Sequence, residues 1–360
     1  MIRIKDIGNF DSVPPLVEAV IQGNIPGMES ALGEGWDINR VIKIGKYTSE
    51  TPLDLALIME CFPSVKWLVE HKAELNKKNN PAFLRAVRYC DEPVIRYLVD
   101  QGAKVDGVNQ VDTEAFQQAL YGKKIKNLAI IHELGHRVEV HGGPALRSAV
   151  SDRNYAAVDF FIDHGVDINY NGADQVYPFK PTPLCVAARY VDMKMVRYLV
   201  DRGADIRIAE SGGMRPYNIA LERGDQEMAD FFKSLEPPEF HSLQNKLLDL
   251  KKYKLPAELV AFLQGNELRL NFSSDYTIGY IDFFPLVDTV EMKQGRTKLL
   301  RISREVDNYT HLYIVWNPKV KSIACYDTEH DELMDIAPFG IFLKDAAEYM
   351  EKVLNGGFLP

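Results

Sequence analysis

The residues of this chain whose types and spacing match a known catalytic chemistry are His132, Glu133 and His136, in the order HExxH. In zinc-dependent hydrolysis, two such histidines on one face of a continuous helix bind the metal and the glutamate acts as general base. Gly135 interrupts this arrangement, because a glycine in this place is typical of a helix end. We therefore expect the helix to stop before His136, with His132 on a core-facing position, and we predict no metal and no cofactor.

The acidic run near the C-terminal end is a second set of residues with possible chemistry. It lacks the glycine and the terminal glutamate of a calcium-binding EF-hand loop. Two interpretations stay open: a solvated turn between strands, or a secondary contact site for basic residues of a partner. The run consists of Asp327, Glu329, Asp331, Glu332 and Asp335.

Other catalytic patterns are missing from the sequence. It contains no glycine-rich phosphate loop, no GxSxG turn and no paired cysteine and histidine site. The four cysteines, Cys61, Cys90, Cys185 and Cys325, are far apart and read as reduced core residues. We predict that the protein is not an enzyme.

The bulk composition is that of an ordinary globular protein with room for two or more domains. The chain has 360 residues, of which 46% are hydrophobic and 26% charged, and its formal net charge is −9. An acidic balance argues against a nucleic-acid surface and leaves open a basic protein partner. No apolar run reaches the length of about 20 residues that spans a bilayer, and no secretory signal opens the chain, so we expect a cytoplasmic protein.

A repeated unit must position any functional side chain in the first two-thirds of the sequence. An alanine recurs every 30–38 residues, and in six copies a second marker follows 16 residues later. Apolar residues around both markers have the i, i+3, i+4 spacing of two short helices, each with one buried face. The alanines are Ala19, Ala56, Ala86, Ala119, Ala149, Ala187 and Ala220, and the second markers are Gly35, Lys72, Gly102, Gly135, Gly165 and Gly203.

This unit resembles the ankyrin repeat. Residues 51–56 (TPLDLA) and 182–187 (TPLCVA) are similar to its TPLHLA signature, and residues 203–206 (GADI) to its GADV. The resemblance covers residues 14–236 and implies an α-solenoid of about seven helix pairs that binds other proteins. Each pair is too small to bury its apolar face alone, so neighbouring pairs must stack.

The period ends at Pro237 and Pro238, and a different pattern follows. Helices are expected from Leu243 and at 255–259, then strands at 279–284, 299–304, 312–316 and 320–326, and a final helix at 339–354. We predict an ankyrin-repeat domain (1–236), a linker (237–242) and a smaller α+β domain with an antiparallel sheet (243–360). The last segment resembles the SUKH superfamily through its Leu-Pro-x-Glu-Leu helix, the strand pair 312–326 and the terminal helix.

A partner is expected on the inner helices and long loops of the repeats, because exposed Tyr and Arg side chains carry much of the binding energy at interfaces. The two longest intervals place extra residues at 43–50 and 170–181, the second with three aromatic side chains. Tyr177 and Tyr190 are both predicted to be exposed. The candidate partner-binding residues are Met59, Arg88, Tyr89, Tyr121, Asp152, Tyr170, Tyr177, Phe179, Arg189 and Tyr190.

Three functions remain at this stage, in order of preference. Ankyrin repeats and SUKH domains are both associated with bacterial toxin–immunity systems, so the resemblances imply a non-catalytic immunity protein that occludes a toxin. The acidic balance of the chain is compatible with a basic toxin domain. The first alternative is a regulatory scaffold that assembles signalling or cell-wall proteins. A zinc hydrolase that uses His132 and His136 is a distant third.

Overall fold

The computed structural model describes residues 13–44 and 49–358, and the chain divides into two compact units between Pro178 and Phe179. This division falls inside the repeats and not at the predicted linker, 237–242. The last two helix pairs therefore share a unit with the C-terminal strands. The boundary at 237–242 between a repeat domain and an α+β domain therefore stays a prediction from the sequence. Among the described residues, none of the helices combines the length and apolar character needed to cross a membrane.

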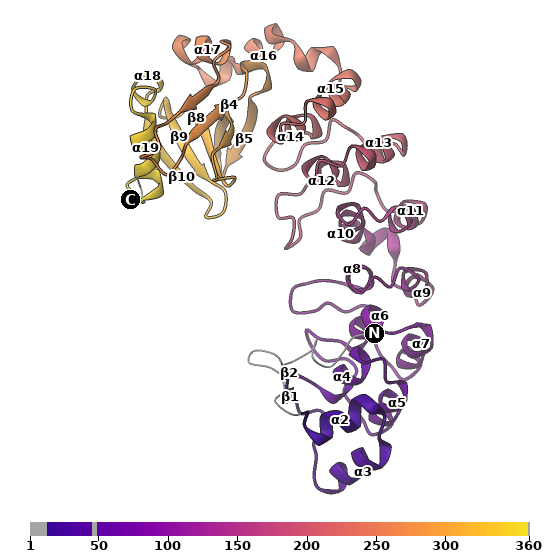
Figure 1. The fold of residues 1–360 in the computed structure, drawn as a ribbon. Coiled ribbons are helices and arrows are strands. Elements are labelled where there is room, and N and C mark those ends of the chain that lie inside the picture. Colours follow the sequence, from indigo (N-terminus) through magenta and orange to yellow (C-terminus); the bar gives the residue numbers. More distant parts are fainter. Residues whose placement is uncertain (1–12, 45–48, 359–360) are drawn as a thin grey trace. The chain divides into compact units, whose positions relative to one another are not determined.

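The first unit consists of antiparallel helix pairs joined by loops, as the spacing predicts. The first helices of successive pairs contact one another and form one row, and the second helices form another (Figure 1). Helix α4 begins with a capping box, in which the side chains of Thr51 and Asp54 bond reciprocally to backbone N–H groups. The pairs are α2 (Pro15–Gln22) with α3 (Ile25–Gly33), α4 (Pro52–Ile58) with α5 (Phe62–Glu70), α6 (Ala82–Tyr89) with α7 (Glu92–Asp100), α8 (Ala115–Tyr121) with α9 (Asn127–Glu133), and α10 (Val138–Ser151) with α11 (Tyr155–Asp163).

The marker residues occupy the places that their types require. Gly35, Gly102, Gly135 and Gly165 have φ between 86° and 98°, a left-handed conformation that disfavours residues with a Cβ. Strands β1 (Ile42–Lys43) and β2 (Ser49–Glu50) form a small hairpin in the first predicted insertion, of which residues 45–48 lie outside the described part. The alanines pack between neighbouring first helices, and Ala119 has no exposed surface.

Enlarging Ala119 should therefore disturb the stack. We expect Ala119→Leu to lower the free energy of unfolding by about 1–3 kcal/mol, because α8 contacts both α6 and α10 and leaves no room for three more carbon atoms. Ala129→Leu is the matched control, since Ala129 is exposed on the paired helix α9. Urea denaturation of both variants measures the difference in the free energy of unfolding. Equal midpoints for the two variants would contradict the close packing of Ala119 between α6 and α10.

The second unit opens with two more helix pairs. They are α12 (Pro183–Arg189) with α13 (Met193–Asp201), and α14 (Pro216–Glu222) with α15 (Gln226–Leu235). Thr182, Asp192 and Asp225 cap the N-termini of α12, α13 and α15, each accepting a hydrogen bond from a backbone N–H. A 3₁₀ turn, η1 (Pro238–His241), follows α15 and ends the helix pairs.

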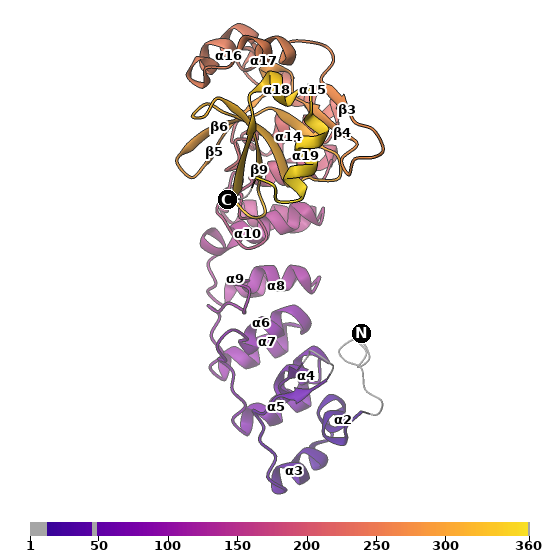
Figure 2. The same cartoon turned by 90° about the vertical axis from the view of Figure 1, so that its left-hand side faces the viewer.

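Antiparallel strands and flanking helices complete this unit (Figure 2). A five-stranded sheet has the order β10-β9-β8-β6-β5, and a three-stranded sheet the order β3-β4-β7. One face of the strands packs on a core that includes Trp316, Phe339 and Met350. The elements are α16 (Leu243–Asp249), η2 (Leu250–Tyr253), α17 (Ala257–Leu263), β3 (Arg269–Asn271), β4 (Tyr280–Phe283), η3 (Leu286–Asp288), β5 (Val290–Gln294), β6 (Thr297–Arg301), β7 (Ser303–Val306), β8 (Leu312–Asn317), β9 (Ser322–Asp327), β10 (Glu332–Ala337), α18 (Phe339–Phe342) and α19 (Ala346–Leu354).

The α+β character agrees with the prediction, but several elements differ. Strands β3, β5 and β10 were not predicted, because they are short or carry charged residues. The single predicted strand at 299–304 is two strands, β6 and β7, which belong to different sheets. The predicted helix 339–354 is also divided, because Asp345 leaves the helical conformation (φ −130°, ψ 32°) and precedes a new helix.

Candidate protein-binding surface

The inner face of the first unit brings together three of the predicted residues, Arg88, Tyr89 and Tyr121, which we call the Arg88 stripe. The Arg88 guanidinium lies 5.3 Å from the ring centre of Tyr89 and 5.9 Å from that of Tyr121. Its Nη1 also donates a hydrogen bond of 3.3 Å to Gln118 Oε1. These contacts hold a cation and two aromatic rings on neighbouring helices.

Gly122 explains why these two helix ends lie so close. A Cβ atom at this position would lie only 1.8 Å from the backbone oxygen of Arg88. The end of α8 therefore rests directly on the end of α6, which places Tyr121 beside Arg88.

Two grooves meet at Arg88. One has a volume of about 860 Å³ and includes Arg88, Tyr121 and Asp152 in its walls. The other, of about 420 Å³, is polar and is lined by Arg88, Arg85 and Glu50 among others. Tyr121 is 41% exposed, so a partner can reach its ring. Asp152 is exposed at the end of α10 and Met59 is half-buried at the end of α4, at the same place in their own repeats.

The predicted exposure of Tyr177 is wrong. This side chain is only 9% exposed, and its ring centre lies 5.1 Å from the guanidinium of Arg147, which is fully buried. The half-buried ring of Tyr170 lies 4.7 Å from the same guanidinium. Arg147 Nη1 donates a hydrogen bond of 2.8 Å to the backbone oxygen of Gly172, so it ties the loop to α10. Sequence reasoning missed Arg147, because a charged residue on a helix gives no sign that aromatic rings will cover it.

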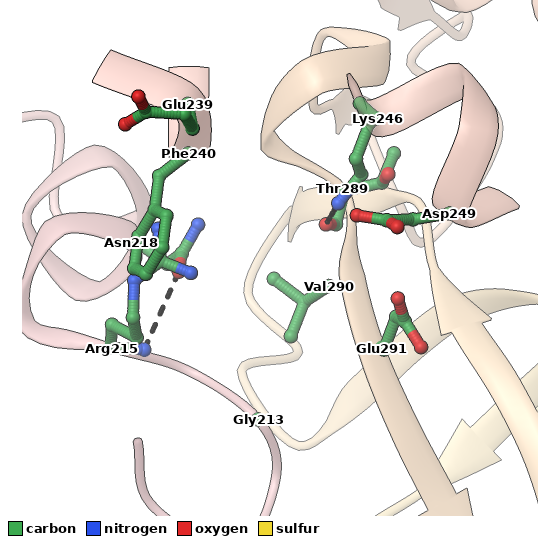
Figure 3. A pocket seen from close by; sticks show the side chains of 10 residues that line it. All are labelled: Gly213, Arg215, Asn218, Glu239, Phe240, Lys246, Asp249, Thr289, Val290 and Glu291. Atoms are coloured by element: carbon green, nitrogen blue, oxygen red, sulfur yellow. Dashed lines mark hydrogen bonds between the residues drawn. The ribbon is translucent and has the colours of Figure 1, made fainter. Parts of the chain in front are cut away.

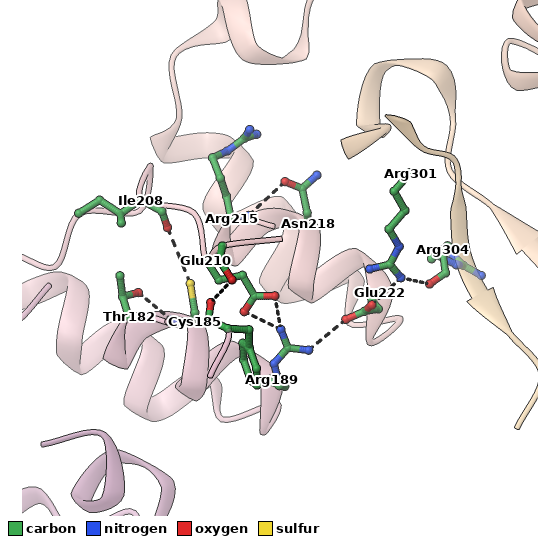
Figure 4. Close-up of polar contacts among 12 residues, drawn as sticks. Thr182, Cys185, Arg189, Ile208, Glu210, Arg215, Asn218, Glu222, Arg301 and Arg304 are labelled. Atoms are coloured by element: carbon green, nitrogen blue, oxygen red, sulfur yellow. Dashed lines mark hydrogen bonds and ion pairs between the residues drawn. The ribbon is translucent and has the colours of Figure 1, made fainter. Parts of the chain in front are cut away.

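In the second unit, Arg189 is engaged within the chain. Its Nη2 donates to both carboxylate oxygens of Glu210 at 2.7 Å, and its Nη1 to Glu222 at 3.3 Å (Figure 4). Phe179 is half-buried, with its ring centre 5.2 Å from the same guanidinium. Tyr190, at the end of α12, is 53% exposed as predicted.

The C-terminal sheet continues this network. Arg301 on β6 donates from Nη2 to the second oxygen of Glu222 at 2.7 Å, and its guanidinium lies 3.6 Å from the ring centre of Tyr313. Arg301 is only 2% exposed. Tyr217 and Asn218 of α14 add hydrogen bonds of 3.1 and 3.4 Å to the side chain and backbone of Asp288. The strands therefore contact α14 directly, and through Glu222 they are linked to Arg189 of α12. Among the described residues of the first unit, no strand makes a comparable contact with the Arg88 stripe.

Gly213 marks the closest approach between these elements. Its φ is 82°, and a Cβ atom there would lie 2.2 Å from the backbone oxygen of Glu291 on β5. We expect Gly213→Ala to lower the free energy of unfolding by about 2 kcal/mol, because it combines an unfavourable backbone conformation with a clash. Gly212→Ala is the matched control, since a Cβ at Gly212 meets no atom within 4 Å. Denaturation midpoints that fall equally for both variants would contradict this close approach.

A pocket of about 280 Å³ lies beside Gly213, between α14 and β5. Arg215, Asn218 and Phe240 line one side, and Lys246 and Glu291 lie on the other (Figure 3). Positive and negative side chains are mixed around it, so it does not select one charge of ligand. Lys246 Nζ donates a hydrogen bond of 2.5 Å to the backbone oxygen of Thr289. Burial lowers the pKa of Lys246 to about 8.

This lowered pKa has a measurable effect on stability. A lysine that binds its proton less tightly in the folded than in the unfolded chain opposes folding while it is charged. That penalty is present below the folded pKa of about 8 and disappears as the pH rises toward about 10.4, the ordinary lysine value. We expect NMR of ¹³C-dimethylated lysines to show one resonance that titrates near pH 8 and is lost in Lys246→Arg. Titration of every resonance near pH 10 would contradict the burial of Lys246.

The acidic run spans the end of β9, its connection to β10 and the first part of β10, so only Glu329 and Asp331 lie in a turn. Asp327 is buried, and its Oδ1 accepts hydrogen bonds from the backbone N–H groups of Glu329 and His330 at 2.9 and 3.2 Å. Its role in the structure is therefore to shape the turn. The rest of the run, Glu329, Asp331, Glu332 and Asp335, is exposed and stays a secondary candidate for contact.

The HExxH residues do not form the helical zinc site of that motif. Helix α9 ends at Glu133, and Gly135 has φ 98°, so the helix does not continue to His136. The predicted core position of His132 is wrong: the side chain is exposed, and its ring centre lies 5.0 Å from that of His164. His136 is buried and lies instead beside Asp106 and His141, with ligand atoms within 4.8 Å of one another.

Comparisons with known proteins agree with the repeat pattern. Residues 146–237 match a family model described as ankyrin repeats (3 copies), and residues 53–99 match one described as ankyrin repeats (many copies). The chain is 25% identical over 209 residues to alpha-latrocrustotoxin-Lt1a and 29% identical over 170 residues to alpha-latroinsectotoxin-Lt1a, both from Latrodectus tredecimguttatus. It is 24% identical over 235 residues to the putative ankyrin repeat protein L271 of Acanthamoeba polyphaga mimivirus.

These similarities are partial. They cover 52%, 44% and 64% of this chain but only 14%, 11% and 29% of the three relatives, so the chain spans less than a third of the length of each. The mimivirus relative is named an ankyrin repeat protein, in agreement with the family models. Residues 53–99 and 146–237 of this chain are ankyrin repeats.

Proposed function

We propose that this chain is a non-catalytic binding protein whose partner occupies the Arg88 stripe. The observation that supports this most strongly is the difference between the two units. Arg88 lies with two tyrosine rings at the meeting point of two grooves, whereas Arg189 is bound to Glu210 and Glu222. An arginine between aromatic side chains is a typical centre of a protein interface.

The biological role that we propose is immunity, in which the protein binds a toxin in the cytoplasm and occludes it. In this proposal the ankyrin repeats supply the binding surface. The C-terminal segment, with its antiparallel strands, is proposed to be a SUKH-like domain. The net charge of −9 favours a basic toxin domain, whose approach it would accelerate. Two relatives are toxins by name, but they correspond to this chain over 14% and 11% of their length. We carry over from them only the binding capacity of the repeats.

The alternative is a regulatory scaffold that assembles signalling or cell-wall proteins. The same Arg88 stripe would then bind several proteins in turn. The two roles differ in the number of partners, since an immunity protein has one dedicated toxin. A hydrolase through His132 and His136 is disfavoured, because α9 ends between the two histidines.

The test is co-purification of the full chain with the products of neighbouring genes, followed by rescue from growth arrest. We expect one dominant partner whose expression alone stops growth, and full rescue by the parent protein. Rescue should fail for Arg88→Ala combined with Tyr121→Ala and persist for Tyr190→Ala, an exposed tyrosine of the second unit at the repeat position that Tyr89 has in the first. Several unrelated partners, none of them toxic, would support the scaffold and contradict the immunity role.

A further inference from the structure

Four side chains from neighbouring loops of the first unit form a histidine–carboxylate cluster: Asp106, Glu114, His136 and His141. Asp106 Oδ1 lies 3.0 Å from His136 Nδ1, and Glu114 Oε2 lies 3.0 Å from His141 Nδ1. Glu114 Oε2 is also 3.7 Å from His136 Nε2, and the two imidazole rings stack with centres 4.3 Å apart. Each carboxylate thus faces an imidazole nitrogen.

The repeat geometry brings these residues together from distant positions in the sequence. Asp106 lies in the loop after α7, and Glu114 precedes α8. His136 follows the helix-ending Gly135, and His141 lies in the first turn of α10. Helix α10 begins at Val138, well before its marker alanine, and this early start carries His141 toward Glu114. The cluster therefore joins the loops of three successive repeats.

Burial within the cluster is graded. The side chain of His136 is 1% exposed, those of Glu114 and His141 are 27% and 29% exposed, and that of Asp106 is 72% exposed. His136 Nε2 is buried and has no hydrogen-bond partner among the described residues. A buried polar nitrogen without a partner is costly, and a native fold normally compensates it with water or an ion. The exposed Asp106 leaves an entry path from solvent.

We propose that this cluster binds a divalent transition-metal ion of the zinc type. Imidazole nitrogens and carboxylate oxygens are the donors that Zn²⁺ uses in proteins, whereas Mg²⁺ and Ca²⁺ prefer oxygen alone. Asp106, His136 and His141 already offer ligand atoms within 4.8 Å of one another. Glu114 faces the other ring nitrogen of His136 from Asp106 and lies 3.0 Å from His141 Nδ1, so it would orient the imidazoles rather than complete the ligand set. Two carboxylates with two neutral imidazoles carry a charge of about −2, which a divalent cation balances. The ion would tie three repeats together.

This site differs from an HExxH centre in a way that can be tested. The HExxH interpretation needs His132, but this residue is exposed and contacts His164. The cluster needs His141 and Asp106, which lie outside that motif. Substituting Asp106 should leave the fold intact, because its side chain is largely exposed.

The experiment is equilibrium dialysis of the full chain against Zn²⁺, with metal content measured by mass spectrometry and melting temperature by circular dichroism. We expect about one Zn²⁺ per parent chain and a higher melting temperature with the ion. Asp106→Asn and His141→Ala should each weaken Zn²⁺ binding at least about tenfold. Both variants should also lose most of the increase in melting temperature that Zn²⁺ gives the parent. The control His132→Ala should bind like the parent.

Two outcomes would overturn the proposal. The first is a parent protein that takes up no stoichiometric Zn²⁺, which would leave the cluster as a set of hydrogen bonds only. The second is a loss of binding in His132→Ala as large as in His141→Ala, which would return the site to the HExxH pair. A His141→Ala variant that fails to fold leaves Asp106→Asn, on an exposed side chain, as the deciding measurement.

Discussion

Replacing Arg189 with alanine is expected to destabilise the second unit by about 2–4 kcal/mol. The guanidinium neutralises Glu210, whose side chain is only 6% exposed, and removing one partner of a buried pair leaves an uncompensated charge. The expected cost is somewhat below that of a fully buried pair, because Arg189 keeps 22% of its side-chain exposure. Urea denaturation gives the size of the loss, and hydrogen exchange in α12 and α14 gives its place.

The pH dependence of this variant supplies a second readout. Burial already raises the pKa of Glu210 above its ordinary value, although Arg189 opposes the shift. Without Arg189 the carboxylate should bind a proton more readily still in the folded chain. A raised folded-state pKa adds stability as the pH falls through it, so the deficit of Arg189→Ala should shrink as the pH is lowered from neutral toward the ordinary glutamate value of about 4.3. A deficit that is constant over this range would contradict the role of Glu210.

Arg207→Ala is the control for this prediction. Arg207 also pairs with a carboxylate, Asp205, at 2.8 Å, but its side chain is 60% exposed. Water screens such a pair, so its loss should leave the free energy of unfolding nearly unchanged. Equal effects of Arg189→Ala and Arg207→Ala would show that the buried network contributes no more than a surface ion pair.

The second large effect is expected on binding. Arg88→Ala combined with Tyr121→Ala should weaken the affinity for the co-purified partner by about a hundredfold or more, since central Arg and Tyr side chains can each contribute about 2 kcal/mol. Folding should change little, because Tyr121 is 41% exposed and Arg88 lies at the rim of two grooves. Isothermal titration calorimetry measures the affinity. Tyr190→Ala, also at an exposed helix end, should bind like the parent.

The repeats could be predicted well because their signals are local. The marker alanines and glycines each depend on residues within one helix pair, and the structure places them at close helix contacts and at left-handed helix ends. Arg88 and Tyr121 were found for the same reason, since a fixed distance from the marker alanine sets their position on the helix. Their role in binding a partner stays a prediction.

The errors concern contacts between residues far apart in the chain. Tyr177 was expected at the surface, but its ring packs on the buried guanidinium of Arg147, which lies on α10 and 30 positions earlier in the chain. The ion pairs of Arg189 within the chain were not predicted: Glu222 links it to Arg301, which lies 79 positions beyond that glutamate. Neither interaction has a period or a short motif, so single-sequence reasoning had no signal for it. The strands that divide between two sheets were missed for the same reason.

The central claim is that the partner binds the open inner face of the first unit and not the inner helices of the second. Hydrogen–deuterium exchange of the full chain, with and without the co-purified partner, tests this most directly. We expect slower exchange in peptides from the ends of α6 and α8, which carry the Arg88 stripe, and unchanged exchange in α12 and α14. Protection confined to α12, α14 or the exposed acidic turn between β9 and β10 would contradict the claim.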